Sequence, residues 1–548
     1  MNIPNKFQSV VYQIYPLSFN DSNGDGFGDI QGIIEKLDYL EKLGVGYIWS
    51  TPFFKSPQND NGYDISNYYE IEPRFGTLED VERLIEEASK RGIGIMFDMV
   101  LNHTSTDHEW FQQALQGDRK KQDYYFFKDK EEIANWQSKF GGSAFKYVED
   151  LDLYYLHLFD VTQADLNWEN PEVFMEVCKI VNFWLEKGVK GLRFDVINLI
   201  SKPETFEDDH IGDGRRFYTD GPKIHEHLQE LNKHTFGKYD DVITVGEMSS
   251  TTIENGVQYA SGDEKELSMI FNFHHLKVDY KNNNKWALKP FDFIELKKIL
   301  SDWQLAMQEN DSYMALFWSN HDQPRVLSRF GDDLNYPDES AKMLATTIHL
   351  MRGMPYVYQG DEIGLPNARF SSIDNYRDVE SLNHYDLLLQ DGHTEEEVIE
   401  IIGERSRDNG RTPMPWTNKE YYGFSTSEPW INFSQSPSLK TVQEQIDNPD
   451  SIFYYTQKLI QLRKELPIIS FGRIEFELLE DPNLFVYKRY YENQELLVIN
   501  NFYASEVTYT IRHVDAEILI SNYPEPKLEQ HLVLKPYQSL VLLMNKAD

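Results

Sequence analysis

The chain is 548 residues long, enough for roughly three to four domains of ordinary size. Hydrophobic residues make up 40% of it and aromatic residues 14%, so it can bury a large core and is not a disordered or low-complexity chain. Acidic residues outnumber basic ones by 90 to 53, a formal net charge of −37, and so acidic a chain repels nucleic acid and anionic membrane surfaces.

Cysteine usage and hydropathy bear on the cellular compartment. Cys178 is the only cysteine, so no intramolecular disulfide can form and a reducing compartment suits the chain. The sequence shows neither the pattern of a secretory signal at its start nor a run of about 18 apolar residues that could span a membrane. We therefore expect a cytoplasmic monomer that acts on a small molecule, with no nucleic-acid or membrane partner.

Eight short apolar runs follow one another in chain order, and helical patterns separate them. They lie at 10–16, 45–52, 93–103, 191–197, 241–248, 268–274, 314–322 and 354–364. The intervening segments 80–92, 174–188 and 339–353 have the apolar spacing of helices and end in a glycine that suits a helix C-cap. Eight such alternations are typical of an α/β fold with a closed parallel (β/α)8 TIM barrel. An open doubly wound sheet is the alternative, although six strands usually suffice for it.

Other segments depart from this pattern. Residues 104–170, after the third strand, are polar and rich in aromatic residues and predict an inserted subdomain, and 365–440 reads as an extra, partly helical segment. Beyond about residue 469, short alternating strands predict an antiparallel β-sandwich. We therefore expect a barrel formed by 1–103 and 171–468, the subdomain at 104–170, and a C-terminal β-sandwich domain at 469–548.

Polar side chains end several of the predicted strands, where a barrel places them on one rim. In chain order they are Asp98, Asn102, His103, Arg193, Asp195, Glu247, Asn320, His321 and Asp322. A single acidic residue at a strand end is often a helix cap or a solvated turn. So many ionisable groups on one eightfold frame instead favour an active site. Two carboxylates that flank a bond are the arrangement for glycoside hydrolysis.

The neighbours of two carboxylates suggest how each is ionised. Arg193 lies two residues before Asp195 on one strand, so both side chains face the same side. The guanidinium is expected to keep Asp195 ionised at neutral pH, as a nucleophile requires. Glu247 follows an apolar run, and desolvation there is expected to raise its pKa toward that of a general acid.

Four segments, DMVLNH (98–103), GLRFDVINL (191–199), TVGEM (244–248) and FWSNHDQPR (317–325), resemble the conserved regions of the α-amylase superfamily, glycoside hydrolase family 13. QADLN (163–167), GYIWSTPFF (46–54) and MPYVYQGDEIG (354–364) extend the resemblance over essentially the whole chain in the right order. The resemblance implies a retaining mechanism with Asp195 as nucleophile, Glu247 as acid/base and Asp322 as transition-state stabiliser. It also implies that His103 and His321 hydrogen-bond the sugar in the −1 subsite.

Two more motifs, NGYDISNYY (61–69) and SRDNGRTPMPW (406–416), resemble the exo-acting α-glucosidase branch of that family. By this resemblance the pocket around the non-reducing sugar is closed or lined by Asp60, Tyr63, Arg193, Arg411, Phe145, Phe159 and Gln163. The family's usual motif has Ala and Gln where this chain has Gly410 and Pro415, which leaves the shape of the Arg411 loop open.

A basic island follows the sixth predicted strand. The segments 245–255 and 266–293 resemble the branch of the family that hydrolyses trehalose 6-phosphate. Residues 274–290 hold four lysines and two histidines against one aspartate, and an anionic substrate that enters an acidic protein needs such local positive charge. Lys277 and Lys285 are the candidates to hold the phosphate, and a solvated loop is the alternative.

Three functions remain open from the sequence. The favoured one is a retaining exo-α-glucosidase that hydrolyses trehalose 6-phosphate to glucose and glucose 6-phosphate. The alternative is an oligo-1,6-glucosidase or dextran glucosidase acting on neutral isomalto-oligosaccharides; Val196, after the nucleophile, resembles the branch members that do not favour α-1,4 bonds. A non-catalytic binding or transporter-associated relative is the third, but it requires a lost carboxylate or a membrane anchor.

The loop at 21–32 has the spacing of a calcium-binding loop. Counted from its first residue, positions 1, 3, 5, 7 and 9 are Asp21, Asn23, Asp25, Phe27 and Asp29, with Phe27 offering its backbone carbonyl. Position 12 is Gly32, where an EF-hand needs a bidentate glutamate, so the loop is not an EF-hand. The resembling glucosidases bind a structural Ca²⁺ (or Mg²⁺) here. We expect the ion to pin the loop without a catalytic part, and a hydrated acidic turn is the alternative.

Overall fold

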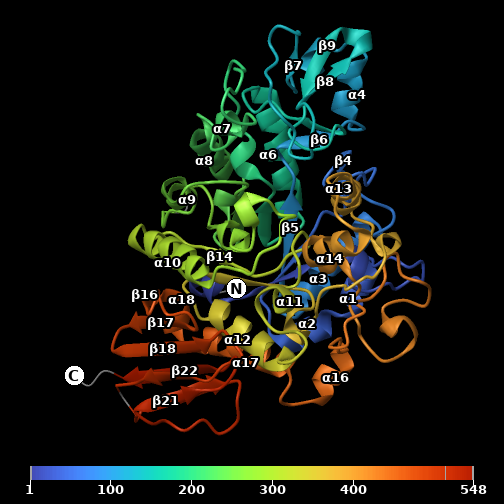
Figure 1. Ribbon diagram of the computed structural model, residues 1–548. Helices are drawn as coiled ribbons and strands as arrows, with labels where there is room; N and C mark the ends of the chain where they lie inside the picture. The colour runs from blue at the N-terminus through green and yellow to red at the C-terminus, as the bar shows by residue number, and fades with distance from the viewer. Residues whose placement is uncertain (1–2, 264, 513, 546–548) are drawn as a thin grey trace. The chain divides into compact units, whose positions relative to one another are not determined.

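The computed structural model describes residues 3–263, 265–512 and 514–545 (Figure 1). Residues 1–2 and 546–548, at the two ends of the predicted domains, lie outside this range. The chain forms two compact units. One is mainly Trp49–Phe273 with Asn310–Tyr313, and the other is Pro4–Ile48, His274–Glu309 and the chain from Met314 onward. The domain boundaries expected from the sequence divide the chain differently and stay predictions.

The eight predicted strands are all present. In chain order they are β1 (Val11–Ile14), β2 (Tyr47–Ser50), β5 (Gly94–Met99), β11 (Gly191–Phe194), β12 (Ile243–Glu247), β13 (Met269–Phe271), β14 (Ala315–Leu316) and β15 (Met354–Tyr358). Neighbours such as β11 and β12, or β1 and β15, pair in parallel. The sheet order is β13-β12-β11-β5-β2-β1-β15-β14, which confirms the predicted barrel. Every strand residue except Glu247 is buried, which explains why the runs are continuously apolar rather than alternating.

The predicted helices begin earlier than their apolar spacing suggested. The segments 80–92 and 174–188 correspond to α3 (Leu78–Lys90) and α6 (Pro171–Glu186). Thr77 and Asp80 form a capping box at the start of α3, and the Asn170 side chain caps α6. Because a first helical turn needs polar caps rather than apolar side chains, the apolar spacing does not reveal it.

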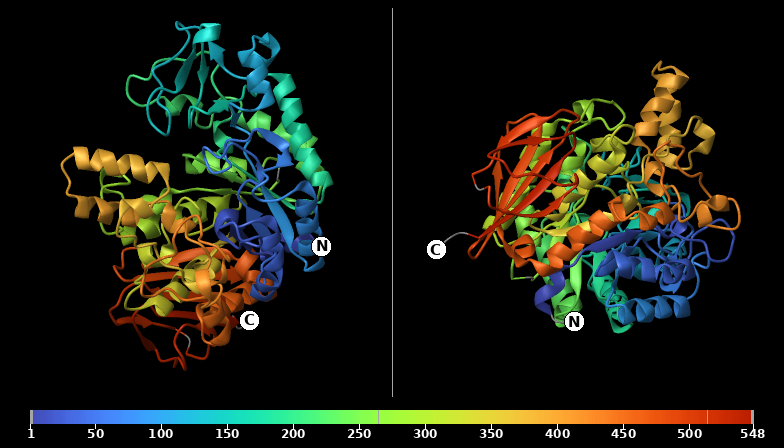
Figure 2. Two further views of the ribbon diagram at one scale, coloured as in Figure 1. Left: turned by 90° about the vertical axis from the view of Figure 1, so that its right-hand side faces the viewer. Right: turned by 90° about the horizontal axis from the view of Figure 1, so that it is seen from below.

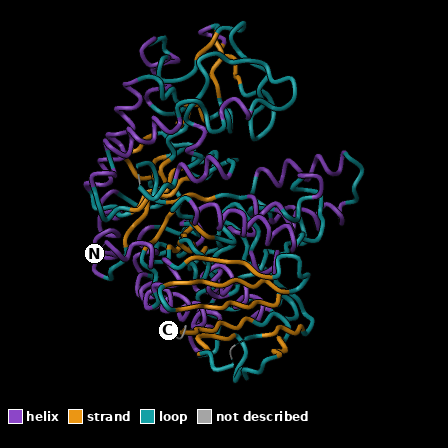
Figure 3. The backbone as a smooth tube through the Cα atoms, turned by 90° about the vertical axis from the view of Figure 1, so that its left-hand side faces the viewer, coloured by secondary structure: helices purple, strands orange, loops and turns teal. Residues whose placement is uncertain are grey.

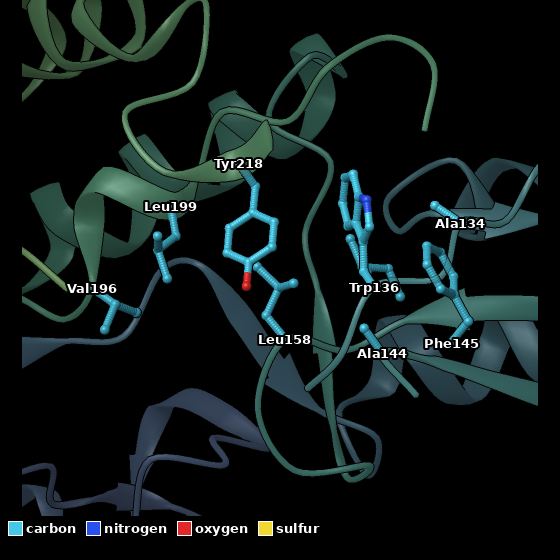
Figure 4. Packing of buried hydrophobic residues seen from close by; sticks show 9 residues of the cluster. Ala134, Trp136, Ala144, Phe145, Leu158, Val196, Leu199 and Tyr218 are labelled. Carbon is cyan, nitrogen blue, oxygen red and sulfur yellow. The ribbon is translucent and has the colours of Figure 1, made fainter. Parts of the chain in front are cut away.

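The segment between β5 and α6 contains small antiparallel sheets. β6 (His103–Ser105) pairs with β10 (Gln163–Asp165), and β9 (Leu153–Leu156) lies between β7 (Phe127–Lys128) and β8 (Phe145–Val148). Figure 1 shows these strands close to α4 (Glu109–Leu115). A buried apolar cluster around Trp136 supports them and includes Val196, directly after the predicted nucleophile (Figure 4).

The C-terminal strands form the predicted antiparallel domain. The larger sheet has the order β16-β17-β18-β22-β20, with strands Arg473–Glu477, Leu484–Tyr491, Gln494–Asn501, Ser539–Asn545 and Glu517–Ser521. Its long strands run side by side near the C-terminus in Figure 3. A smaller sheet pairs β19 (Val507–Thr510) with β21 (His531–Leu534). Leucine, isoleucine and valine side chains from both sheets form one buried cluster, as in a β-sandwich.

Two further helices, α13 (Val379–Gln390) and α14 (Glu395–Arg405), lie side by side as the gold pair in Figure 2. Their side chains form an apolar cluster with Trp286, which belongs to the predicted basic island. The ring of Trp286 also stacks on His384 of α13, with 4.5 Å between ring centroids. The island is therefore attached to this helical pair. Within the described ranges, no helix is long and apolar enough to cross a membrane.

Candidate active site

One guanidinium, that of Arg193, joins three carboxylates on neighbouring strands. Its Nη1 lies 2.7 Å from Asp98 Oδ1 and 2.6 Å from Asp195 Oδ1, and its Nη2 pairs with Glu247 Oε2. The strand register produces this meeting, because Arg193 of β11 lies opposite Asp98 of β5 and Val245 of β12. Asp195 and Glu247 thus share one cation. This favours the short carboxyl separation of about 5–5.5 Å that a retaining glycosidase needs.

Burial and the arginine act in opposite directions on the ionisation of Asp195 and Asp98. Burial raises the pKa of Asp195 to about 6 and that of Asp98 to about 6, although Arg193 opposes both shifts. The guanidinium acts in the expected direction, because it lowers the pKa of Asp195, but desolvation outweighs it in the net shift. With a pKa of about 6, Asp195 is still mostly ionised at neutral pH, as a nucleophile must be.

The backbone turns sharply directly after Asp195. Val196 has φ +37° and ψ 39°, a left-handed conformation that is strained for a β-branched residue. The turn leads into the 3-10 helix Ile197–Leu199 and directs the Val196 N–H at Glu247 Oε2, 3.4 Å away. The strained peptide therefore couples the position of Asp195 to that of Glu247.

Five of the residues predicted to bind sugar lie together in the same unit. The Gln163 side-chain amide donates to Asp60 Oδ2 at 3.0 Å and lies 3.2 Å from His103 Nε2. The Tyr63 hydroxyl donates to Asp98 Oδ2 at 3.0 Å, which links this group to the three carboxylates. The rings of His103 and Phe159 are 5.3 Å apart between centroids.

Phe145 lies in the buried apolar cluster against which Phe159 also packs. Its ring is buried in the apolar cluster against Trp136, 6.1 Å away between ring centroids (Figure 4). Phe140, which the sequence analysis did not single out, packs edge-on against Phe159 at 5.8 Å and is 48% exposed. Phe140, five residues before Phe145, is thus a second candidate to line the sugar site, and the role of Phe145 stays a prediction.

A buried lysine, Lys202, which was not predicted as a site residue, contacts the residues beside His103. Lys202 Nζ lies 2.7 Å from both Asp165 Oδ1 and Asn102 Oδ1, and the lysine and aspartate side chains are fully buried. The Asn102 amide in turn lies 2.9 Å from Asp165 Oδ1 and 3.2 Å from His103 Nδ1. Lys202 therefore fixes the residue next to His103. A lysine at the end of the apolar run 196–201 was the available signal.

The second unit carries Asp322 and its cations. Arg411 donates to Asp322 Oδ1 at 2.8 Å and to the His321 carbonyl at 3.0 Å, and Arg407 Nη1 lies 3.5 Å from the same carboxylate oxygen. Burial raises the pKa of Asp322, but His321 and the two arginines outweigh it and hold the pKa well below its usual range. Asp322 is therefore a carboxylate at any physiological pH.

The structure shows why a glycine fits at position 410, where the usual motif has alanine. A Cβ at this position would lie 2.8 Å from the Asn320 carbonyl oxygen and 2.9 Å from that of Gln323, closer than side chains tolerate. The glycine lets the short helix α15 (Asp408–Arg411) pack directly on the backbone beside Asp322.

A row of alternating charges leads from Asp322 to the basic island. After the 3.5 Å step from Asp322 to Arg407, Arg407 Nε lies 3.6 Å from Glu380 Oε2, and the same oxygen accepts from Lys285 Nζ at 2.6 Å. We call these four residues the charge row. Lys277 lies outside it, exposed on the 3-10 helix His274–Lys277. The structure thus brings one of the two predicted phosphate lysines within a few side-chain contacts of Asp322.

The loop at 21–32 is held by its own backbone. Asp21 accepts from the N–H groups of Asn23, Gly24 and Gly26, and Asp29 accepts from Ser22 and from the Gly32 N–H at 2.6 Å. Asn23 and Asp25 each accept from the N–H two residues on. Across the parts of the chain that the structure describes, no three His, Cys, Asp or Glu side chains are grouped to hold a metal. A site here must therefore use Asn23 and the Phe27 carbonyl as well.

The parallel barrel, with Asp195 and Glu247 paired to one guanidinium, has the fold and the two neighbouring carboxylates of a glycoside hydrolase. Comparison with known families identifies the type: residues 13–472 match the α-amylase catalytic domain, and residues 484–541 match the C-terminal domain of the α-amylase SusG. The chain therefore belongs to the α-amylase family, glycoside hydrolase family 13.

Similar proteins span the whole chain. Trehalose-6-phosphate hydrolase of Bacillus subtilis is 51% identical over 98% of each chain, and oligo-1,6-glucosidase of Bacillus cereus is 46% identical over 97% of this chain and 98% of its own. Among solved structures, trehalose-6-phosphate hydrolase of Bacillus licheniformis superposes with a TM-score of 0.95 at 52% identity, covering 98% of this chain and 99% of that one.

Proposed function

We propose that the protein is a retaining exo-acting α-glucosidase that hydrolyses trehalose 6-phosphate to glucose and glucose 6-phosphate. The similarity to trehalose-6-phosphate hydrolases over the whole chain supports this proposal. The observation that carries it is the charge row, because Lys285 lies only three side-chain contacts from Asp322. A phosphate on the leaving sugar needs a cation close to the bond that breaks.

In the proposed reaction Asp195 attacks the anomeric carbon while Glu247 donates a proton to the glycosidic oxygen. The bond to glucose 6-phosphate breaks, and a covalent glucosyl ester forms on Asp195. Glu247, now ionised, then takes a proton from a water molecule that attacks the ester and releases glucose with the original anomeric configuration. Asp322 is proposed to stabilise the positive charge of the oxocarbenium-like transition state, with His103 and His321 on the sugar hydroxyls.

A competition between two substrates tests the proposal. Purified protein should release glucose from trehalose 6-phosphate with a higher kcat/KM than from isomaltose. The second candidate, an oligo-1,6-glucosidase, is favoured by the 46% identity to that enzyme of Bacillus cereus, and it predicts the opposite order. Faster release from isomaltose would therefore replace the proposed function by the second candidate.

We also propose that the loop at 21–32 binds a structural Ca²⁺ (or Mg²⁺) through Asp21, Asn23, Asp25, Phe27 and Asp29. Oxygen donors at alternate positions support it, because both ions prefer oxygen ligands. Positive φ at Gly24 and Gly26 lets the loop turn tightly around such a centre. The ion would fix the loop and take no part in the reaction.

The compartment and the oligomeric state are likewise proposals. A cytoplasmic location is supported by the single cysteine and by the charge of the proposed substrate, since a phosphate ester does not cross membranes unaided. We propose that the protein acts as a monomer, because all the residues assigned above to the reaction come from one chain.

A further inference from the structure

We propose that Glu380 is a displaceable stand-in for the substrate's phosphate, which holds the two cations of the charge row until a phosphorylated sugar takes its place. This inference rests on the proposed function. In the structure one oxygen of Glu380 contacts both Lys285, at 2.6 Å, and Arg407, at 3.6 Å. When substrate binds, its phosphate takes over these two cations and the Glu380 carboxylate turns away.

The two cations are held by contacts other than Glu380. Arg407 donates twice to the buried Asp378 Oδ1, from Nε at 2.9 Å and from Nη2 at 2.7 Å. The Lys285 ammonium lies over the ring of Trp286, 4.9 Å from its centroid. Because Asp378 and Trp286 are both buried, the two cations keep their places when Glu380 leaves.

Of Glu380, Lys285 and Arg407, Glu380 has the side chain that can move. Its side chain is 33% exposed, against 20% for Lys285 and 11% for Arg407. It lies in the first turn of α13, where a rotamer change carries the carboxylate into solvent without a backbone shift. A mobile anion between two fixed cations is the arrangement for exchanging one anion for another.

Only a substrate that carries phosphate can bring about this exchange. A phosphate monoester has a charge of about −1.5 to −2 at neutral pH, so it competes with a single carboxylate for the two cations. A neutral sugar offers no charge and leaves the ion pair in place. Glu380 therefore weakens the binding of every anion, and an anion that also has the contacts of a bound sugar, as the proposed substrate has, still binds.

Glu380→Gln keeps the shape of the side chain and removes its charge, and Asp386→Asn on the exposed face of the same helix is the matched control. The first readout is the KM for trehalose 6-phosphate, together with the ratio of kcat/KM for this substrate to that for a neutral aryl α-glucoside. The second is the inhibition constant of inorganic phosphate against aryl α-glucoside hydrolysis.

With the carboxylate gone, KM and the phosphate inhibition constant should both fall roughly two- to tenfold, the range for losing contacts of partly exposed charges. The ratio of kcat/KM values should rise, and Asp386→Asn should change none of the three. When Glu380→Gln is added to Lys285→Ala, it should lower KM and the phosphate inhibition constant by less, since one of the two cations is already lost.

An unchanged or higher KM in Glu380→Gln overturns the inference, since Glu380 would then be inert or would position Lys285. That result leaves the proposed function standing as long as the wild-type protein prefers trehalose 6-phosphate to isomaltose. If the wild-type protein prefers isomaltose, the proposed function itself fails.

Discussion

Replacing Lys285 by alanine should weaken trehalose 6-phosphate hydrolysis mainly through KM. A charge-assisted hydrogen bond to phosphate contributes about 1.5–3 kcal/mol, which corresponds to roughly 10- to 150-fold. Lys285 is 20% exposed and already paired with Glu380, so solvent and the competing carboxylate reduce the net contribution. We therefore expect the lower part of that range, roughly 10- to 30-fold. The loss appears in KM because the phosphate is remote from the bond that breaks and is held similarly in ground and transition states.

The assay compares initial rates on trehalose 6-phosphate and on a neutral aryl α-glucoside, with Lys289→Ala as the control from the same loop, where Lys289 is exposed. Added salt should weaken the phosphorylated substrate more than the neutral one. The same measurement on Lys277→Ala tests the predicted second lysine. Equal losses on both substrates in Lys285→Ala would mean that the lysine supports the loop's fold, and no loss would leave it a solvated residue; either result refutes the reasoning.

Asp195→Ala should abolish turnover of both substrates. In the wild-type protein, kcat/KM should fall roughly tenfold per pH unit below about pH 6, because the raised pKa of Asp195 lets it take up a proton there. Because that pKa is higher in the folded state than in the unfolded state, protonation of Asp195 favours the fold; a loss of activity that only tracks unfolding by circular dichroism would contradict this assignment. Lys202→Met should lower the free energy of unfolding by about 3–5 kcal/mol, because it leaves Asp165 charged and buried, and denaturant titration measures it; a change below about 1 kcal/mol argues against the buried pair. Chelation should lower the melting temperature in calorimetry while sparing activity at low temperature, and an unchanged melting temperature with and without added Ca²⁺ would speak against the proposed ion at 21–32.

The barrel was predictable because its strands are buried on both faces and so stand out as apolar runs. The carboxylates were predictable for a related reason: a charged residue such as Asp195 or Glu247 at the end of an apolar run is conspicuous, and the family's motifs surround both. Parallel pairing then brings strand ends together, and the three groups on Arg193 follow from that register.

What the sequence could not supply depends on contacts between distant segments. Lys202 meets Asn102 across 100 residues, and Lys285 meets Glu380 across 95. No local pattern encodes such pairs, so the charge row and the buried lysine appear only in the folded chain. The burial of Asp195, which raises its pKa against the effect of Arg193, likewise has no direct mark in the sequence.

The left-handed Val196 has a consequence for how this enzyme can change under selection. A glycine at that position would relieve strain of about 1–3 kcal/mol, but it would also remove a side chain from the buried cluster around Trp136 and give the unfolded chain more freedom. It would also let the peptide after Asp195 rotate, and the nucleophile would spread over orientations that do not react. Packing and turnover therefore both retain this strained side chain, and a laboratory search for heat-resistant variants is expected to leave Val196 unchanged.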